Sequence, residues 1–207
     1  GKLPGSLGQV FVKKSGRDQI WITVETCHIL NLEMNFLEQS IPNNITDLTN
    51  LEILDLDDND LTSTIPQDIK YLTSLRNLTI RNNNLNGSLP SFECLSNLEV
   101  LDLGVNELSG HITSSFCDDL RKLRILRLDN NTFTGNLPHN MDELGNDNGL
   151  HNLEYLHLQW NGLEGRIQNV GIDKLTSLIE LRLDHNFFIE EIPVTPLAFA
   201  NSFSKIP

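Results

Sequence analysis

The feature that most constrains the fold of this chain is a leucine pattern that returns at nearly constant intervals. The pattern is Leu-x-x-Leu-x-Leu-x-x-Asn-x-Leu, and one complete copy begins at Leu51 and reaches its asparagine at Asn59. Seven copies are anchored by an asparagine, namely Asn35, Asn59, Asn83, Asn106, Asn131, Asn161 and Asn186. The intervals between these anchors are 24, 24, 23, 25, 30 and 25 residues. A period in this range predicts a solenoid, in which each repeat buries its apolar face only by packing against its neighbours.

Each repeat predicts one short strand, one turn and one helical segment. In Leu54-Asp55-Leu56 apolar and polar residues alternate, so that the leucines face the core while the aspartate faces solvent. The anchor asparagine follows where the chain leaves the strand, and its amide can donate to and accept from backbone groups of adjacent coils. Five copies place a proline seven residues after the asparagine, and the stretch from Ile65-Pro66 to Ile69 predicts a 3₁₀ helix on the opposite face. We therefore expect a right-handed α/β solenoid with a parallel sheet on its concave face and short 3₁₀ turns on its convex face.

Two copies carry a glycine that typifies one class of these repeats. They read Leu85-Asn86-Gly87-Ser88-Leu89-Pro90 and Phe133-Thr134-Gly135-Asn136-Leu137-Pro138. This pattern resembles the plant-type leucine-rich repeats, whose hallmark after the asparagine is Leu-x-Gly-x-Ile-Pro, and the resemblance covers about Cys27 to Pro193. That class is found in ectodomains of plant receptor-like kinases, in polygalacturonase-inhibiting proteins and in algal proteins, including those of diatoms. The resemblance implies a non-catalytic module that binds a protein or peptide in an extracellular or lumenal setting.

The repeats divide the chain into three parts. Residues 27–193 form seven leucine-rich repeats, residues 1–26 a partial repeat with an irregular segment, and residues 194–207 a truncated repeat or tail. Within residues 1–26, the stretch Phe11–Gln19 predicts a turn-bearing insertion, and Ile20–Val24 predicts a strand. Both ends resemble interrupted repeats without cysteine-paired caps, and an uncapped solenoid exposes an apolar layer. We expect a processed or partial segment, or a chain whose coil ends are covered by neighbours in a larger assembly.

Composition excludes several classes of function. The net charge of −13 and the pI of about 4.7 argue against a nucleic-acid partner and are easier to reconcile with a basic protein surface. The sequence has no apolar run of 18 residues and no apolar segment after Gly1-Lys2, so neither a membrane span nor a signal peptide is predicted. It also lacks Gly-x-Ser-x-Gly, a phosphate-binding loop, His-Glu-x-x-His and Cys-x-x-Cys, so we expect neither an enzyme nor a cofactor. The stretch from Asp55 superficially resembles a calcium loop, but Asp60 replaces its glycine and Pro66 its glutamate, so no metal site is predicted.

The candidate binding face consists of the side chains that flank each anchor asparagine on the solvent side of the predicted sheet. Its candidate residues are Asp55, Asp57, Asp58, Asp60, Arg81, Arg127, His157, Trp160, Arg182, His185 and Phe187. Polar residues are ordinary at outward strand positions, whereas Trp160 and Phe187 have no core role there. We expect the aromatic residues to dominate recognition of a protein or peptide and the aspartates to tune its approach. The alternative is a structural or scaffold subunit that is buried in a larger assembly.

Four asparagines begin candidate N-glycosylation sequons: Asn44, Asn77, Asn86 and Asn130. About three sequons are expected by chance from the composition, so their number decides nothing. Asn44 and Asn86 fall at back and edge positions where a glycan would fit. Asn77 and Asn130 flank the predicted strands, where a glycan would crowd the sheet.

Two cysteines lie at equivalent positions of adjacent coils. Cys94 and Cys117 each follow their anchor asparagine by eleven residues, which makes them candidates for a disulfide, with two free thiols as the alternative. Cys27 stands at a leucine position and predicts a buried thiol that acts as a small apolar side chain. Residues 145–152 lengthen one repeat and predict a surface loop.

Overall fold

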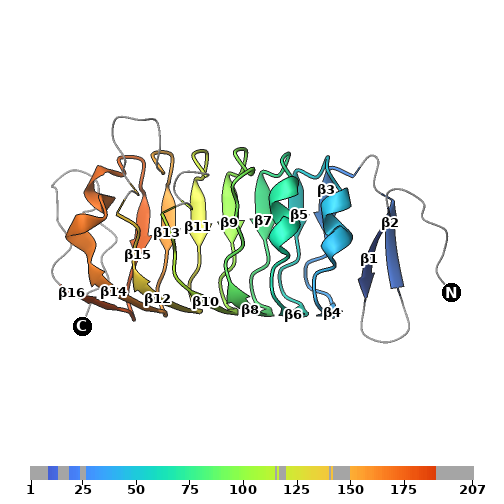
Figure 1. Cartoon of the computed structure of the whole chain (residues 1–207), viewed down its shortest axis with the longest axis horizontal. Helices are drawn as coiled ribbons and strands as arrows, with labels where there is room; N and C mark the ends of the chain where they lie inside the picture. Colours follow the sequence, from blue (N-terminus) through green and yellow to red (C-terminus); the bar gives the residue numbers. More distant parts are fainter. Residues whose placement is uncertain are drawn as a thin grey trace.

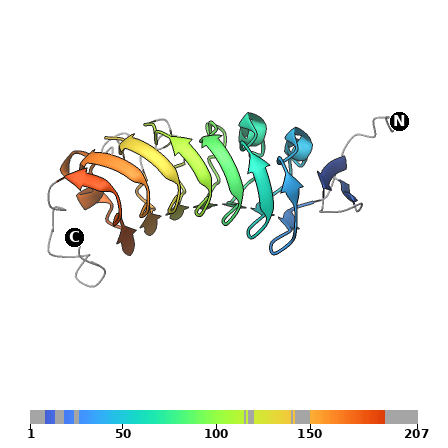
Figure 2. The same ribbon diagram turned by 90° about the horizontal axis from the view of Figure 1, so that it is seen from below.

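The repeats form a solenoid. The computed structural model describes residues 9–13, 19–23, 27–114, 116, 120–139, 141 and 150–189 of the 207-residue chain. Its coils stand side by side along the long axis of the molecule (Figure 1), and the view from below shows the stack bending along its length (Figure 2). The predicted fold class is confirmed.

Each coil contributes one three-residue strand to a parallel sheet on the concave face. The strands are β3 (Ile29–Asn31), β5 (Ile53–Asp55), β7 (Asn77–Thr79), β9 (Val100–Asp102), β11 (Ile125–Arg127), β13 (Tyr155–His157) and β15 (Glu180–Arg182). Their register aligns equivalent residues, so that Leu126 lies opposite Leu101 and Leu156. The leucines thus form a continuous ladder in the core, where Leu126 is only 2% exposed and Leu128 fully buried.

A second parallel sheet, which was not predicted from the sequence, runs along the flank of the solenoid. Its strands are β4 (Glu38–Gln39), β6 (Asp60–Ser63), β8 (Asn84–Ser88), β10 (Glu107–Gly110), β12 (Thr132–Asn136), β14 (Gly162–Arg166) and β16 (Phe187–Ile189). Six of these segments begin at the residue after an anchor asparagine, and β4 begins three residues after Asn35. Because this turn recurs in successive coils, their backbone groups come opposite one another, and pairing satisfies N–H and C=O groups that the turn would otherwise leave free.

The convex face carries short 3₁₀ helices in the described part of the chain. They are η1 (Asn43–Asp47), η2 (Gln67–Tyr71), η3 (Ile167–Asn169) and η4 (Ile172–Lys174). The predicted helix after Ile65 is therefore confirmed. Pro66 precedes η2 as its extended N-cap, with φ −54° and ψ 132°, instead of occupying the first helical position.

A two-stranded antiparallel hairpin precedes the first coil. It pairs β1 (Gln9–Lys13) with β2 (Gln19–Thr23), and Phe11 lies opposite Trp21. The predicted strand from Ile20 is confirmed. The prediction of a turn-bearing insertion from Phe11 is wrong for residues 11–13, because they form strand pairs with β2.

The anchor asparagines hold successive coils together. The Nδ2 group of Asn83 donates to the carbonyl oxygens of Leu56 (3.0 Å), Arg81 (3.2 Å) and Ile80 (3.4 Å), and its Oδ1 accepts from the N–H of Leu61 (3.0 Å). The same bonding is repeated at Asn59, Asn106, Asn131, Asn161 and Asn186. The predicted hydrogen bonding is thus confirmed, whereas the predicted burial is complete at Asn59, Asn83 and Asn131 and only partial at Asn106 and Asn161.

Candidate binding face

The concave sheet and the turns that follow it present most of the candidate residues together. Asp55, Arg127, His157 and Arg182 end their strands, Asp57 and Arg81 stand two residues further on, and Asp58, Trp160 and His185 directly precede the anchor asparagines. Two candidates lie elsewhere. Asp60 begins β6 and Phe187 begins β16, so both belong to the second sheet. The chain turns into the second sheet immediately after each asparagine, and the part of these two residues in a ligand site stays a prediction.

The residue before each anchor asparagine has a left-handed backbone. This holds for residues as unlike as Asp58 (φ 54°), Val105 (φ 53°) and Trp160 (φ 59°). Such a φ is uncommon for residues other than glycine and asparagine, and it persists only where surrounding contacts impose it. Here the contacts are backbone bonds between coils, such as the one from the Trp160 N–H to the Asp184 carbonyl (3.1 Å). The turn therefore sets the direction of Trp160 whatever its side chain prefers.

The acidic end of the face has no ion pair among the described residues. Asp55 Oδ2 accepts from Asn31 Nδ2 at 3.0 Å, and Asp57 Oδ1 accepts from the backbone N–H of Arg81 at 2.6 Å. Burial raises the pKa of Asp57 to about 6, and repulsion from Asp55 and Asp102 adds to this although the Arg81 N–H acts in the opposite direction. The patch thus keeps an uncompensated negative charge, which a cationic group of a partner would relieve.

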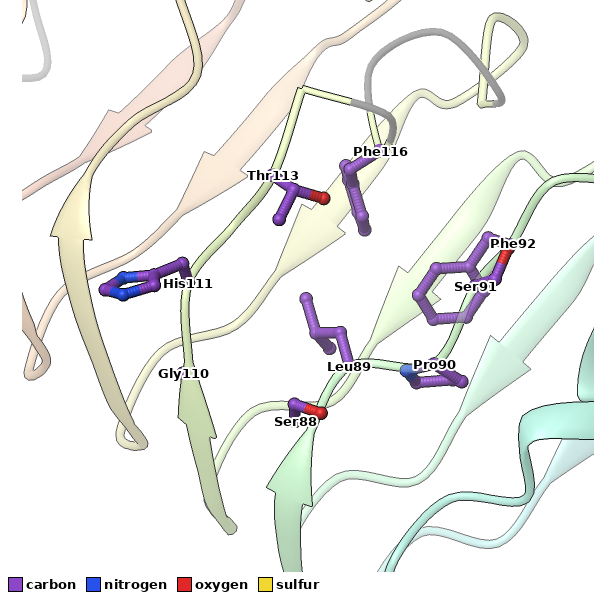
Figure 3. A pocket seen from close by; sticks show the side chains of 9 residues that line it. All are labelled: Ser88, Leu89, Pro90, Ser91, Phe92, Gly110, His111, Thr113 and Phe116. Atoms are coloured by element: carbon purple, nitrogen blue, oxygen red, sulfur yellow. The ribbon is translucent and has the colours of Figure 1, made fainter.

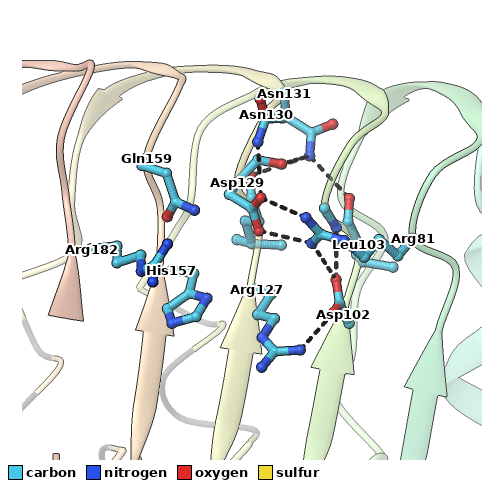
Figure 4. A network of polar contacts seen from close by, with 12 residues as sticks. Arg81, Asp102, Leu103, Arg127, Asp129, Asn130, Asn131, His157, Gln159 and Arg182 are labelled. Atoms are coloured by element: carbon cyan, nitrogen blue, oxygen red, sulfur yellow. Dashed lines mark hydrogen bonds and ion pairs between the residues drawn. The ribbon is translucent and has the colours of Figure 1, made fainter. Parts of the chain in front are cut away.

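The centre of the face is a network of compensating charges (Figure 4). Arg81 donates from Nη1 and Nη2 to both carboxylate oxygens of Asp129, at 3.0 and 2.9 Å, and Arg81 and Arg127 lie 3.3 and 3.4 Å from the two oxygens of Asp102. Burial would raise the pKa of Asp129, but the bonds from Arg81 and Asn130 outweigh it and hold that pKa below its ordinary value. Arg81 is therefore committed to an internal bidentate pair rather than available to a ligand.

A glycine makes this network possible. Arg81 and Asp129 are separated by 48 residues, and the coil between them carries Gly104 where its neighbours carry a side chain. A Cβ atom at Gly104 would collide with the Arg81 guanidinium and would stand 2.8 Å from Asp129 Oδ1. The missing side chain lets Arg81 reach across one whole coil.

Unpaired polar atoms gather at the next coil. His157 and Gln159 are each only 8% exposed, yet His157 Nε2, Gln159 Oε1 and the Nε of Arg127 have no hydrogen-bond partner. Burial lowers the pKa of His157, which outweighs the opposing effect of Glu180, whose Oε1 lies 3.4 Å from Nε2. A buried polar atom without a partner costs about 1–3 kcal/mol, so a donor placed near Gln159 Oε1 would be stabilising, whereas His157 Nε2 already has the Glu180 carboxylate nearby.

An aromatic stack stands beside these atoms. The Trp160 and His185 rings lie parallel within 12°, with their centroids 3.5 Å apart, and Trp160 is 52% exposed. Asp184 Oδ2 lies 2.8 Å from His185 Nδ1 and orients that ring. Of the two aromatic residues predicted for the concave face, Trp160 is thus present there as an exposed and oriented platform.

The described residues contain no group of three or more His, Cys, Asp or Glu side chains arranged to hold a metal ion. They also contain no helix that is long and apolar enough to cross a membrane.

Known proteins share this repeat and this architecture. The family described as Leucine Rich Repeat matches residues 50–72, 97–118 and 122–144. Receptor-like protein 41 of Arabidopsis thaliana is 37% identical over 105 residues. The leucine-rich-repeat ectodomain of the Arabidopsis thaliana membrane receptor kinase GASSHO1/SCHENGEN3, solved in complex with CASPARIAN STRIP INTEGRITY FACTOR 2, is 35% identical and superimposes with a TM-score of 0.73 over 80% of this chain. The chain thus carries leucine-rich repeats of the plant type, similar to those of these plant receptor proteins.

The relatives are much longer than this leucine-rich repeat chain. It covers 11% of Receptor-like protein 41, which matches 51% of the chain, and 19% of the GASSHO1/SCHENGEN3 ectodomain. The Arabidopsis receptor kinase HAESA, solved in complex with the peptide hormone IDA and the co-receptor SERK1, is 31% identical with a TM-score of 0.69, and the chain covers 26% of it. The similarity therefore concerns a stretch of repeats that forms part of larger ectodomains.

One charged feature of the leucine-rich repeat face was missed from the sequence. The residues seven positions before the anchor asparagines form ion pairs from coil to coil: His28–Glu52 (3.1 Å), Glu52–Arg76 (3.5 Å), Arg76–Glu99 (3.1 Å) and Arg124–Glu154 (2.8 Å). Aligning the copies by their asparagines shows the alternation of charge, which was the available signal. The side chains of these pairs are partly or largely accessible to solvent, so each pair contributes little to stability.

The four sequon asparagines differ in their surroundings. Asn86 is exposed on β8, and Asn44 is half-buried within η1. Asn77 lies in β7 between two neighbouring strands of the concave sheet, and Asn130 is exposed but donates from Nδ2 to Asp129 (2.9 Å). Glycosylation stays a prediction, and Asn86 has the most open position of the four.

Cys94 is exposed and Cys117 lies outside the described residues, so their disulfide stays a prediction, with free thiols as the alternative. Cys27 is only partly buried, although it packs against the core as expected. Residues 145–149 of the predicted surface loop lie outside the described residues, which resume at Leu150.

Proposed function

We propose that this chain is a segment of a non-catalytic, extracellular or lumenal ectodomain that binds a protein or peptide ligand on its concave face. The observation that carries the proposal is the Trp160–His185 stack, which is exposed beside the unpaired buried atoms of His157 and Gln159. An exposed aromatic platform supplies apolar contact area at a low entropic cost, and unmatched polar groups next to it favour a polar chain over a purely apolar surface.

The relatives support the same class of ligand. The GASSHO1/SCHENGEN3 ectodomain was solved with CASPARIAN STRIP INTEGRITY FACTOR 2, and the plant peptide hormone receptor RGFR1, which is 28% identical with a TM-score of 0.72, was solved with RGF2. The chain covers 25% of RGFR1, so the class of ligand is inferred here from a relative that is matched over only part of its length.

The charge of the concave face favours a ligand with a basic group at one end. Asp55, Asp57 and Asp58 have no ion pair among the described residues, whereas the charges of Arg81 and Asp129 already compensate one another. A lysine or arginine of the ligand would sit near the aspartates and an apolar or aromatic residue near Trp160. The ligand would then extend across several coils, which suits an extended peptide.

Selection from a displayed library of random peptides tests this proposal. Peptides that bind the 207-residue chain are measured against Trp160→Ala and against Tyr71→Ala, a matched control because Tyr71 is an equally exposed aromatic residue in η2. We expect Trp160→Ala to weaken binding about 10- to 30-fold, as a hot-spot truncation of about 2 kcal/mol would, and Tyr71→Ala to leave it unchanged.

The same selection separates the two hypotheses. A library that yields no peptide dependent on Trp160 would contradict recognition on this face. The alternative of a structural subunit in a larger assembly would then be favoured.

A further inference from the structure

One residue of every coil stands in a row along the concave face, directly before the anchor asparagine. The row consists of Met34, Asp58, Asn82, Val105, Asn130, Trp160 and His185. All seven residues have a left-handed backbone, with φ between 53° and 59°. Each of the first six donates its backbone N–H to a carbonyl oxygen of the next coil, as Met34 does to Asp57 (3.0 Å) and Trp160 does to Asp184 (3.1 Å). The row therefore advances by one coil at each residue without a break.

The two ends of the row carry exposed anchors of different kinds. Trp160 is 52% exposed, and Met34, five coils away, is 74% exposed. Asp58 lies in the coil next to Met34 and is exposed, and it has no ion pair among the described residues. Large apolar side chains that are exposed beside an uncompensated charge favour a partner with apolar and cationic side chains.

The middle of the row suits the backbone of an extended chain. Asn82, Val105 and Asn130 carry no charge, and Gly104, next to Val105, has no side chain. The two asparagines are exposed, and each donates from Nδ2 to an aspartate of its own or the preceding turn. Their Oδ1 atoms can therefore accept hydrogen bonds from the N–H groups of a peptide.

The regularity of the row translates into a spacing within the ligand. Neighbouring coils stand about 4.8 Å apart at a sheet, so Asp58 and Trp160, which are four steps apart in the row, are separated by about 19 Å. An extended peptide rises about 3.3 Å per residue and covers that span in about six residues. Six is an even number, so side chains at this spacing point to the same side of an extended chain. Met34 lies one step beyond Asp58, within reach of a ligand residue two positions further out.

The hollow between the coils of Leu89 and Thr113 offers no comparable anchor (Figure 3). Its two aromatic rings, Phe92 and Phe116, are almost completely buried and pack edge to face against one another. These rings belong to the core and present no surface to a ligand. The exposed side chains of the row therefore mark a better site for an extended ligand than this hollow does.

We propose that the row selects peptides by the spacing of three side chains. An apolar residue of the ligand contacts Met34, a lysine or arginine two positions away contacts Asp58, and an aromatic residue six positions beyond that contacts Trp160. The inference rests on the proposed function, because it requires an extended peptide on the concave face. It adds the contact with Met34 and the spacing, neither of which the proposed function requires.

Fluorescence anisotropy with synthetic peptides and the 207-residue chain tests the spacing. The first probe is a labelled peptide of serine and threonine with leucine, arginine and phenylalanine at its first, third and ninth positions, and a second probe has the same residues in reverse order. We expect one of the two probes to bind. Moving its phenylalanine by one position in either direction should weaken binding about 5- to 10-fold, because the ring then points away from Trp160. Equal affinities at spacings of five, six and seven, or no binding of either probe, would overturn the proposal.

A double-mutant cycle locates the apolar contact. Met34→Ser should weaken binding of the leucine-bearing probe about 3- to 10-fold and leave a probe with serine in place of that leucine unaffected. Ile189→Ser alters another exposed apolar residue, in β16, and should change the affinity of neither probe. The contact with Met34 is wrong if Met34→Ser weakens both probes equally or weakens neither.

The Trp160→Ala variant separates a failure of the spacing rule from a failure of the proposed function. Binding that depends on Trp160 but not on the spacing or on Met34 would overturn the spacing rule and leave the proposed function intact. If Trp160→Ala binds the probes as well as the unaltered chain does, both are overturned.

Discussion

Replacing Asn83 by leucine tests whether the anchor asparagines hold the coils together. The two side chains have similar volume, so the substitution removes polar groups without opening a cavity. Asn83 links its own coil to the preceding one by two bonds, from the Leu61 N–H to Oδ1 (3.0 Å) and from Nδ2 to the Leu56 carbonyl (3.0 Å). Both bonds are buried, and Asn83 itself is 8% exposed.

The expected cost follows mainly from the first of these bonds. Without Asn83, the Leu61 N–H loses its buried partner, whereas the Leu56 carbonyl keeps the bond from Asn59 Nδ2 (3.1 Å). We therefore expect Asn83→Leu to lower the free energy of unfolding by about 1–3 kcal/mol, the cost of one buried group left without a partner. The neighbouring Asn84 is exposed on β8, so Asn84→Leu should change the free energy by less than about 0.5 kcal/mol.

Two measurements check this expectation. Urea unfolding of both variants gives the overall free-energy difference, and hydrogen exchange of the Leu61 amide reports the link between coils directly. The second measurement matters because a solenoid can lose cooperativity between its repeats, and a single unfolding free energy is then poorly defined. The reasoning is refuted if Asn83→Leu is as stable as Asn84→Leu and the Leu61 amide keeps its protection.

Three further predictions concern the core and the charged face. Leu126→Ala should cost about 2–5 kcal/mol in urea unfolding, because the ladder of leucines cannot close around the cavity; a cost below about 1 kcal/mol would contradict the burial of Leu126. Gly104→Ala should displace the Arg81 guanidinium and so raise the pKa of Asp129, which a titration followed by carboxyl-carbon chemical shifts would report. An unchanged pKa of Asp129 would contradict the claim that Arg81 reaches Asp129 only because Gly104 has no side chain. The pKa of Asp57 is raised in the folded chain from 3.8 to about 6, so its stabilising contribution is complete below pH 3.8 and is lost as the pH rises through about 6. Asp57→Asn should therefore remove part of the stability that the unaltered chain gains between pH 7 and pH 5. If the free energies of unfolding of the variant and the unaltered chain depend on pH in the same way, Asp57 does not have this role.

The sequence alone predicts the repeating framework, because each repeat encodes it locally. Leucine alternation around positions such as Leu54 and Leu56 specifies which face of the strand is buried. An asparagine such as Asn59 can form hydrogen bonds with the backbone groups of the turn wherever a similar coil follows. Neither inference requires knowledge of a distant residue. The same regularity allowed most of the concave face to be assigned by counting from the asparagines.

Only the tertiary structure decided what those residues do on the face. Arg81 is bound to Asp129 across the coil of Gly104, a pairing over 48 residues that depends on a missing side chain in between. Phe187 belongs to the second sheet, because pairing between turns of adjacent coils is a property of the stack rather than of one repeat. A single repeat determines its own strand and turn, whereas charge pairing, strand membership and cavities depend on how unequal coils meet, and that is fixed only when they pack together.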